Sequence, residues 1–525
     1  MKNKLIMALS LILALTLTAC SAEVGMDYNG ATPQQYYAEI FNNEPSFAAA
    51  EYDPEGYNTE EYSTIVESGF KSPQTEPLST FSADVDTASY TNIRRFINQG
   101  ADIPKGAVRI EEMLNYFDYD YPEPEAGKTF STNVEIGDCP WNENTKLMKI
   151  GIQTAKVDTS EMPPSNLVFL IDSSGSMYSE NKLPLIKKAF SLVLENMGEN
   201  DRISVVTYAS GNDILIDGGT IQDKDEILEI LASLEAAGST HGSGGITTAY
   251  KIAEKNFIDG GINRVILATD GDLNVGVTSE SALKKLIEEK REGGVYLSVL
   301  GVGTGNIKDN KMETLADNGN GNYSYIDSVN EAKRVLIEEK GATFFTVAKD
   351  VKFQVEFNPE TVKGYRLIGY ENRLLENSDF TDDTKDAGEL GAGHSVTVLY
   401  ELALAGSEQE VKEYDLEFSA SLSNGSTDIC KISTRYKPLD SDTSVQEDTL
   451  VPAEKLEEAV SGDFYLACAV AEFGMILRDS EYKGTATFDS VLELAANSGE
   501  REFAELVEKA KNAHRFRKQN RLPFH

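Results

Sequence analysis

Between residues 165 and 340, short continuous apolar runs alternate with longer stretches of helical periodicity. The apolar runs predict strands that are buried on both faces, at 167–171, 203–208, 265–268 and 295–300. Apolar residues at three- and four-residue spacing predict helices at 183–197, 224–234, 247–257 and 279–292. This alternation predicts an α/β domain, with a doubly wound, mostly parallel, Rossmann-like sheet and helices on both faces.

The segments that flank this domain have other patterns. Residues 81–150 contain two short stretches with helical spacing and predict a small N-terminal helical module that docks on the domain. Alternation of apolar and polar residues predicts an antiparallel β module over 342–436, followed by a polar linker at 440–448. Helical spacing returns after residue 452 and predicts a helical C-terminal module over 452–525.

The N-terminal 20 residues have the pattern of a signal peptide, with a basic start and an apolar run that is too short to span a bilayer. The run ends in Leu-Thr-Ala-Cys-Ser, which resembles the bacterial lipoprotein cleavage box and implies that Cys20 carries a diacylglyceryl thioether. The alternative is a secreted protein with a chance cysteine at its cleavage site. Residues 21–80 are acidic and predict a flexible tether. We therefore expect an exported protein, anchored to the cell membrane or outer membrane by lipid alone.

Charge and cysteine content narrow the functional classes. The chain has 48 Lys+Arg against 86 Asp+Glu, a formal charge of −38, which argues against nucleic-acid binding. The segment 509–521 is basic, and we interpret it as a solvated helix end rather than a nucleic-acid patch. Besides Cys20 there are three cysteines, too few for a disulfide scaffold of this length. Cys468 lies in an apolar helical stretch and is expected to be a buried thiol, whereas a bridge between Cys139 and Cys430 stays open.

Three loops rich in side-chain oxygens adjoin the predicted strands and helices. They lie at 172–177 after the first strand, at 238–245 before a helix, and at 269–272 after the third strand. Ligands of open α/β sheets bind beyond the carboxyl ends of the strands, where the winding reverses, so we expect these loops to face one crevice. Together they offer two carboxylates and three hydroxyls: Asp172, Ser174, Ser176, Thr240 and Asp270.

These five side chains form an all-oxygen set, which favours Mg²⁺, Mn²⁺ or Ca²⁺ over zinc or copper. Two carboxylates bring a bound dication close to neutrality, so a further oxygen from outside the chain is still attracted. Helix capping accounts for single Ser and Asp residues at such loops, but not for three oxygen-rich loops at one sheet edge.

Asp-x-Ser-x-Ser after an apolar strand, a downstream Gly-Ser-Thr, and Thr-Asp-Gly after another strand together resemble the von Willebrand factor type A (VWA) domain. The resemblance implies a metal-ion-dependent adhesion site with all five positions present. It implies that the serines and the threonine can bind the metal directly and that the aspartates often act through water. Mg²⁺ is the first expectation, with a protein partner that donates a carboxylate. Local phrases at 81–87 and 472–478 also resemble the flanking regions of a bacterial subfamily of exported VWA proteins.

We interpret the chain as a non-enzymatic adhesion or scaffolding lipoprotein. A metal-dependent hydrolase that uses the same cation is one alternative, but no general base is evident beside the five residues. The other is a structural envelope protein whose flanking modules carry the interactions. Weaker hypotheses are a Ser243–His241 nucleophile pair, phosphate binding at Gly242–Gly245 without a Walker lysine, and a calcium role for Asp272.

Overall fold

The computed structural model describes residues 58–83, 86–157, 162–239, 242–271, 280–385, 387–412, 425–439, 441 and 443–520. The predicted signal peptide, Cys20 and the first part of the expected tether lie outside these residues, as do residues 413–424 of the expected β module. Within the described ranges, no helix has both the length and the apolar character that crossing a bilayer requires.

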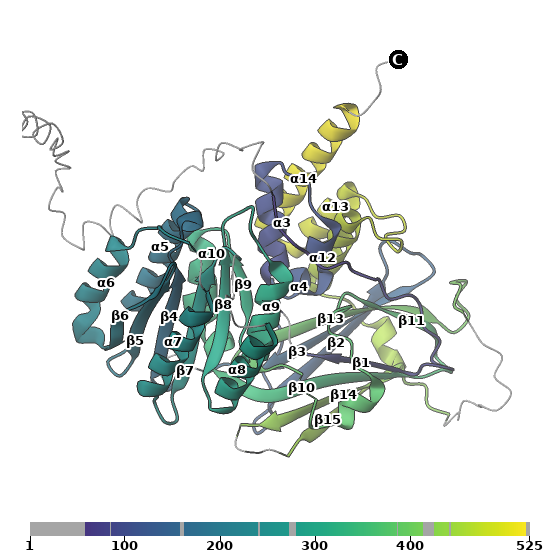
Figure 1. Cartoon of the computed structure of the whole chain (residues 1–525). Coiled ribbons are helices and arrows are strands. Elements are labelled where there is room, and N and C mark those ends of the chain that lie inside the picture. Colours follow the sequence, from purple (N-terminus) through teal and green to yellow (C-terminus); the bar gives the residue numbers. More distant parts are fainter. Residues whose placement is uncertain are drawn as a thin grey trace, which may run out of the picture. The chain divides into compact units, whose positions relative to one another are not determined.

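A six-stranded sheet, drawn in teal in Figure 1, forms the centre of the α/β domain. The strands run in the order β6-β5-β4-β7-β8-β9, and neighbouring strands are parallel except β5 and β6. Their bounds are β4 (Ser165–Asp172), β5 (Arg202–Tyr208), β6 (Asn212–Gly219), β7 (Ile262–Thr269), β8 (Tyr296–Val302) and β9 (Tyr323–Ile326). The antiparallel β6 is an addition to the predicted pattern.

Helices cover both faces of this sheet because alternate side chains of its buried strands point to opposite sides. On one face the ring of Phe169 in β4 stacks on Phe190 of α5, with centroids 3.9 Å apart. On the other, Val168 and Leu170 belong to a core that includes Ala249 of α7. The doubly wound α/β fold is therefore confirmed. The helices are α5 (Leu183–Glu195), α6 (Lys224–Ser233), α7 (Gly242–Lys255), α8 (Glu280–Glu292), α9 (Asp309–Asn318), α10 (Val329–Lys333) and α11 (Lys340–Phe344), with a π-helical turn, η5 (Arg334–Glu338).

Two antiparallel sheets pack face to face beside this domain. The first has the order β1-β10-β14-β15, with β12 paired to β10, and the second has the order β11-β13-β3-β2. Their shared core contains Phe353 from the first sheet and Ile150 and Val398 from the second. The strands are β1 (Leu78–Ser82), β2 (Phe130–Asp138), β3 (Lys146–Thr154), β10 (Thr346–Phe357), β11 (Val362–Ile368), β12 (Leu390–Gly391), β13 (Ser395–Leu404), β14 (Cys430–Pro438) and β15 (Val445–Val451).

This pairing changes the expected division of the flanking segments. Residues 81–150 contain helices as predicted, but they also contribute β2 and most of β3 to a sheet with β11 and β13. The β module at 342–436 is therefore completed by strands that precede the α/β domain. The expected linker at 440–448 is wrong from Val445 onward, because β15 begins there and pairs with β14. Its polar composition reflects an edge strand with mostly solvent-facing side chains.

Helices from both ends of the chain form a further layer. Leu466, Val470 and Phe473 of α12 are buried, together with Met113 of α4. The helices are α3 (Ala88–Gln99), α4 (Ile110–Leu114), α12 (Gly462–Arg478), α13 (Phe488–Ser498) and α14 (Arg501–Asn520). Short 3-10 turns are η1 (Lys105–Ala107), η3 (Gly175–Tyr178), η4 (Ile221–Asp223), η6 (Asn377–Thr381) and η7 (Ala453–Glu457).

Residues 58–63, here called the N-terminal arm, lie along the loop 303–308 between β8 and α9. The backbone N–H of Thr59 donates to the carbonyl of Gly305 at 2.8 Å, and that of Glu61 donates to Ile307 at 2.9 Å. The described part of the expected tether, 58–80, is thus hydrogen-bonded to the fold, and its last residues form β1.

The cysteines Cys139, Cys430 and Cys468 are buried free thiols, so Cys139 and Cys430 are not bridged. Burial raises the pKa of Cys139 to about 12 and raises those of Cys430 and Cys468 as well. The prediction of a buried thiol at Cys468 is confirmed.

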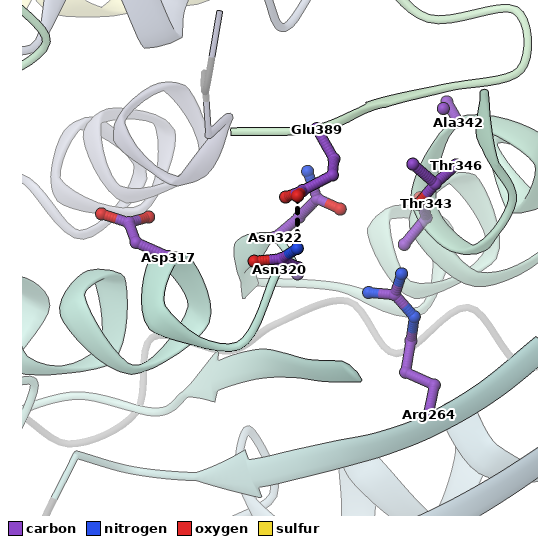
Figure 2. A pocket seen from close by; sticks show the side chains of 10 residues that line it. Arg264, Asp317, Asn320, Asn322, Ala342, Thr343, Thr346 and Glu389 are labelled. Atoms are coloured by element: carbon purple, nitrogen blue, oxygen red, sulfur yellow. Dashed lines mark hydrogen bonds between the residues drawn. The ribbon is translucent and has the colours of Figure 1, made fainter. Parts of the chain in front are cut away.

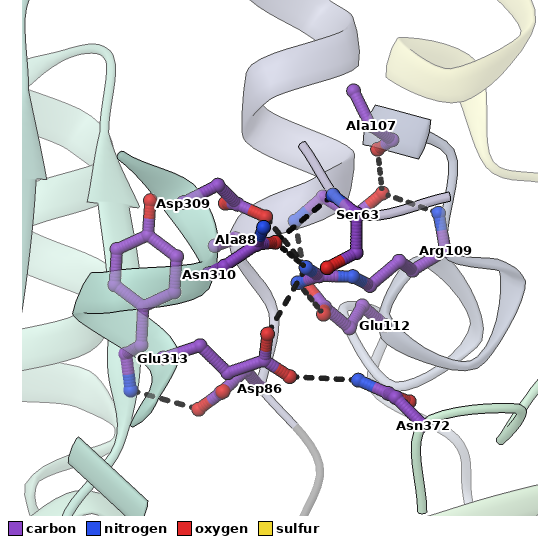
Figure 3. Close-up of polar contacts among 12 residues, drawn as sticks. Ser63, Asp86, Ala88, Ala107, Arg109, Glu112, Asp309, Asn310, Glu313 and Asn372 are labelled. Carbon is purple, nitrogen blue, oxygen red and sulfur yellow. Dashed lines mark hydrogen bonds and ion pairs between the residues drawn. The ribbon is translucent and has the colours of Figure 1, made fainter. Parts of the chain in front are cut away.

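Two buried arginines hold α9 to its neighbours, and the surroundings of the first are shown in Figure 3. Arg109 pairs with Asp309 at 2.7 Å and with Glu313 at 3.0 Å, and it also pairs with Glu112 one helical turn away. Arg373 reaches α9 from the segment after β11, and its guanidinium lies 2.9 Å from Glu313. We call this group the arginine cluster; its members are Asp86, Arg109, Glu112, Asp309, Glu313, Asp317 and Arg373.

Glu111, next to this cluster, makes stability depend on pH. Burial, together with the charges of Glu371 and Glu112, raises its pKa to about 8, and its Oε2 has no hydrogen-bond partner among the described residues. Between pH 4.5 and 8 the folded chain therefore holds a proton that the unfolded chain has released, so the free energy of unfolding falls as pH rises. In the natural protein, Glu111 should make the free energy of unfolding fall by up to about 1.4 kcal/mol per pH unit over this range. We expect Glu111→Gln to lack this contribution and to be more stable than the natural protein at pH 8.5. Chemical denaturation at several pH values checks this.

The matched control is Glu112→Gln, which removes a carboxylate that pairs with Arg109 at 2.8 Å. This variant should lose stability at neutral pH, because it weakens the ion pairing of a buried arginine. It should keep a fall of stability with pH, though a smaller one, because the charge of Glu112 is one of the causes that raise the pKa of Glu111. Parallel pH profiles of the natural protein and Glu111→Gln would contradict the assignment to Glu111.

Candidate functional site

Two carboxylates lie at neighbouring strand ends in the α/β domain. Asp172 is the last residue of β4, and Asp270 follows directly after β7. These strands pair in parallel with Ile171 opposite Ala268, which brings their carboxyl ends to the same edge. The chain winds from β4 to β5 on one side and returns to β7 on the other, so this edge is the switch point of the fold.

The Asp172 carboxylate is fully buried and held from both sides. Its Oδ1 accepts from the backbone N–H of Ser174 at 2.9 Å. Its Oδ2 accepts from the hydroxyl of Tyr208 at 3.2 Å and from that of Thr269 at 3.3 Å. Burial raises the pKa of Asp172 to about 6, and the nearby charge of Asp270 adds to this, while the bonds from Ser174 and Tyr208 oppose it.

The two serines of the first loop face each other. The hydroxyl oxygens of Ser174 and Ser176 lie 3.0 Å apart. Ser176 belongs to η3, which begins at Gly175, directly after the buried Ser174. The tight turn brings both hydroxyls to the sheet edge where Asp172 ends β4.

The second loop is hydrogen-bonded to the first. The N–H of Gly175 donates to the carbonyl of Gly238 at 3.1 Å, and the N–H of Ala237 donates to Ser173 at 2.8 Å. Thr240 and His241 lie outside the described residues, so the place of Thr240 in the site stays a prediction. The chain up to Ser239 runs beside the serine loop.

Asp270 has a contact that the sequence pattern does not reveal. The ammonium group of Lys182 donates to its Oδ2 at 2.8 Å and also to the backbone carbonyl of Ser176 at 3.0 Å. The amide of Asn306, from the loop 303–308, lies 3.4 Å from the same oxygen. A lone lysine before a helix and an asparagine in a loop carry no periodic signal, so sequence reasoning missed both.

The donor set tests whether a divalent ion fits here. Among the described residues, no three His, Cys, Asp or Glu side chains are grouped so that they could hold a metal ion. The side-chain oxygens that the described residues offer at this edge are the hydroxyls of Ser174 and Ser176 beside the carboxylate of Asp172. Such hard oxygen donors suit Mg²⁺. The carboxylate of Asp270, by contrast, already forms an ion pair with Lys182.

A polar cleft, lined in part by Arg264, Asn320 and Glu389, lies near the opposite ends of the strands. Arg264, close to the start of β7, is buried there and donates to the hydroxyl of Ser298 at 2.6 Å. Figure 2 shows it across the cleft from the hydrogen-bonded pair Asn320 and Glu389. Burial lowers the pKa of Arg264 to about 10, so it stays charged at neutral pH.

Three family models match successive parts of the chain. They are "von Willebrand factor" at 56–149, "von Willebrand factor type A domain" at 166–338, and "Uncharacterized protein YfbK, C-terminal" at 342–513. A relative described as "Uncharacterized protein YfbK", from Escherichia coli (strain K12), is 41% identical over 447 residues, which are 83% of this chain and 77% of the relative. The chain belongs to the YfbK family of VWA-domain proteins. The resemblance to the VWA domain and to its bacterial flanking modules is confirmed.

More distant matches are confined to part of the chain or have low similarity. Inter-alpha-trypsin inhibitor heavy chain H4 of Bos taurus is 26% identical over 155 residues, which are 28% of this chain and 17% of that protein. The solved von Willebrand factor type A protein of Catenulispora acidiphila is 13% identical, with 86% and 91% of the two chains covered and a TM-score of 0.40. As a VWA-domain protein, the YfbK-family chain belongs to a family involved in protein interactions.

Gly303 shapes the wall against which the Lys182 stem lies. Its φ is +77°, and a Cβ placed there would approach Cε of Lys182 to 2.3 Å. Gly305 also has a positive φ, +89°, but its Cβ would meet nothing within 4 Å. We expect Gly305→Ala to cost about 1–2 kcal/mol of unfolding free energy through backbone strain, and Gly303→Ala to cost at least about 1 kcal/mol more. Chemical denaturation of both variants measures the difference, and equal losses would show that Lys182 moves aside freely.

Proposed function

We propose that this protein binds a protein partner through a divalent cation held at the Asp172 edge of its VWA domain. Asp172, Ser174, Ser176, Thr240 and Asp270 would hold the ion, with Mg²⁺ as the preferred metal. The bound ion would supply positive charge for a carboxylate donated by the partner. The supporting observation is the convergence of Ser174 and Ser176, whose hydroxyls lie 3.0 Å apart beside the two strand-end carboxylates.

The surface around these residues suits a protein ligand. The side chain of Tyr178, two residues after Ser176, is 77% exposed. Exposed tyrosines next to a polar anchor are frequent centres of protein interfaces, because the ring offers a large contact area with little conformational freedom to lose. A partner that places a carboxylate at the ion would therefore find an aromatic contact close by.

Replacement of a ligand hydroxyl tests the proposal. We expect Ser174→Ala to weaken Mg²⁺ and Mn²⁺ binding by at least about tenfold in isothermal titration, because it removes a proposed direct donor. Ser173→Ala is the matched control: its hydroxyl bonds to the backbone carbonyl of Tyr208 at 3.3 Å and is not in the donor set. Equal affinities of the two variants, or no metal binding by the natural protein, would contradict the proposed site.

We further propose that the protein is exported and held at the membrane by lipid on Cys20. The chain carries a formal charge of −38, which disfavours binding to anionic lipid, so attachment would rest on the acyl chains. Cys20→Ser should move the protein from the membrane fraction to the soluble fraction after cell lysis and abolish incorporation of labelled fatty acid. Cys139→Ser, at a buried thiol, is the control and should leave both unchanged.

A further inference from the structure

A lysine occupies the space beside the Asp270 carboxylate. The Lys182 side chain is 7% exposed, and its ammonium lies 2.8 Å from Oδ2 of Asp270, which is fully buried. The same ammonium donates to the carbonyl of Ser176, whose hydroxyl belongs to the proposed metal shell. Lys182 therefore bridges two parts of the donor set.

The local chain fixes this lysine in place. Lys182 directly precedes α5, and its backbone N–H donates to the carbonyl of Ser179 at 2.9 Å, which closes the serine loop. Its stem runs against Gly303, at the start of the loop 303–308 that also supplies Asn306 to Asp270. A long side chain packed along a glycine is enclosed on several sides, unlike a surface lysine that folds inward by chance.

The lysine changes the charge balance of the site. Asp172 and Asp270, when ionised, carry two negative charges and Lys182 carries one positive charge, so the group is −1 without metal. With a dication the same group is +1. In a buried place of low effective dielectric, two unit charges a few ångströms apart interact much more strongly than they do in water. The ammonium therefore opposes the incoming ion and leaves a positive excess once the ion is bound.

We propose that Lys182 is a positioning residue that serves as an internal counter-ion of the metal site. It holds Asp270 in place when no metal is bound, and it competes with the divalent ion for that carboxylate. In the loaded site, its charge makes the metal group a net cation, which favours an anionic ligand over a neutral one. This inference rests on the proposed function, within which Lys182 would set the metal affinity and the ligand preference of the site.

The test compares Lys182→Gln with the natural full-length chain, with Mn²⁺ alone as the probe. We expect the variant to bind Mn²⁺ about tenfold tighter in isothermal titration, because the repulsion between ammonium and dication is gone. We also expect its metal-free form to melt at a lower temperature, because Asp270 is left buried without its cation. A purely structural role for the lysine would weaken stability and metal binding together, so the opposite signs of the two effects identify the counter-ion.

Lys187→Gln is the matched control, since it removes the same charge from the same region of α5. The Lys187 ammonium donates to the backbone carbonyls of Ala232 and Leu234, at the end of α6, and not to the metal site. Its Mn²⁺ affinity should equal that of the natural protein.

The outcomes separate this inference from the proposed function. Equal or weaker Mn²⁺ binding by Lys182→Gln, in a protein whose natural form does bind the ion, overturns the counter-ion alone. Binding by the variant and not by the natural chain supports competition by the lysine but overturns the proposed metal-dependent function of the natural protein. Absence of binding in both overturns the metal site and the counter-ion with it.

Discussion

The ion pairs of the arginine cluster hold α9, and with it the loop that precedes α9, in place at the edge of the α/β domain. Arg109 and Arg373 reach α9 from two other parts of the chain and pair with its carboxylates. The loop 303–308 leads directly into α9, so clamping the helix also fixes the loop that touches Lys182 and Asp270. Loss of one partner in such a buried group costs about 3–5 kcal/mol, because the other charge stays behind without compensation. The geometry at the proposed metal site therefore depends on contacts made outside the donor set.

This cluster is richer in acids than in bases, so burial and mutual repulsion favour the protonated form of its carboxyl groups. Burial raises the pKa of Asp309 to about 7, although the charge of Arg109 opposes the shift, and it raises that of Glu313 to about 6. A carboxyl that retains a proton near neutral pH can lie close to a second carboxylate without full repulsion. Two arginines can thus hold several acids from different elements.

Local sequence patterns predicted the parts of the fold that depend on local physics. A strand covered on both faces needs a continuous apolar run, and β4 and β7 extend only a few residues beyond the runs that predicted them. The positions of Asp172 and Asp270 could be predicted in the same way, because each lies where such an apolar run ends. By contrast, β15 is polar because it is an edge strand, and Lys182 reaches the site through packing against Gly303. Neither feature produces a periodic pattern in the sequence. The pairing of β3 with β13 joins segments that precede and follow the α/β domain, which local patterns do not reveal.

The unbridged cysteines can report which part of the folded chain opens. The described fold contains three buried thiols and no bridge among them, so its native state needs no oxidant to form. The thiolate is the form that reacts with alkylating reagents, and burial keeps these side chains protonated and shielded while the chain is folded. Cys139 and Cys468 lie in the helical core and Cys430 lies between the two antiparallel sheets. The order in which the three become labelled under mild denaturation therefore reveals which of these two cores loosens first.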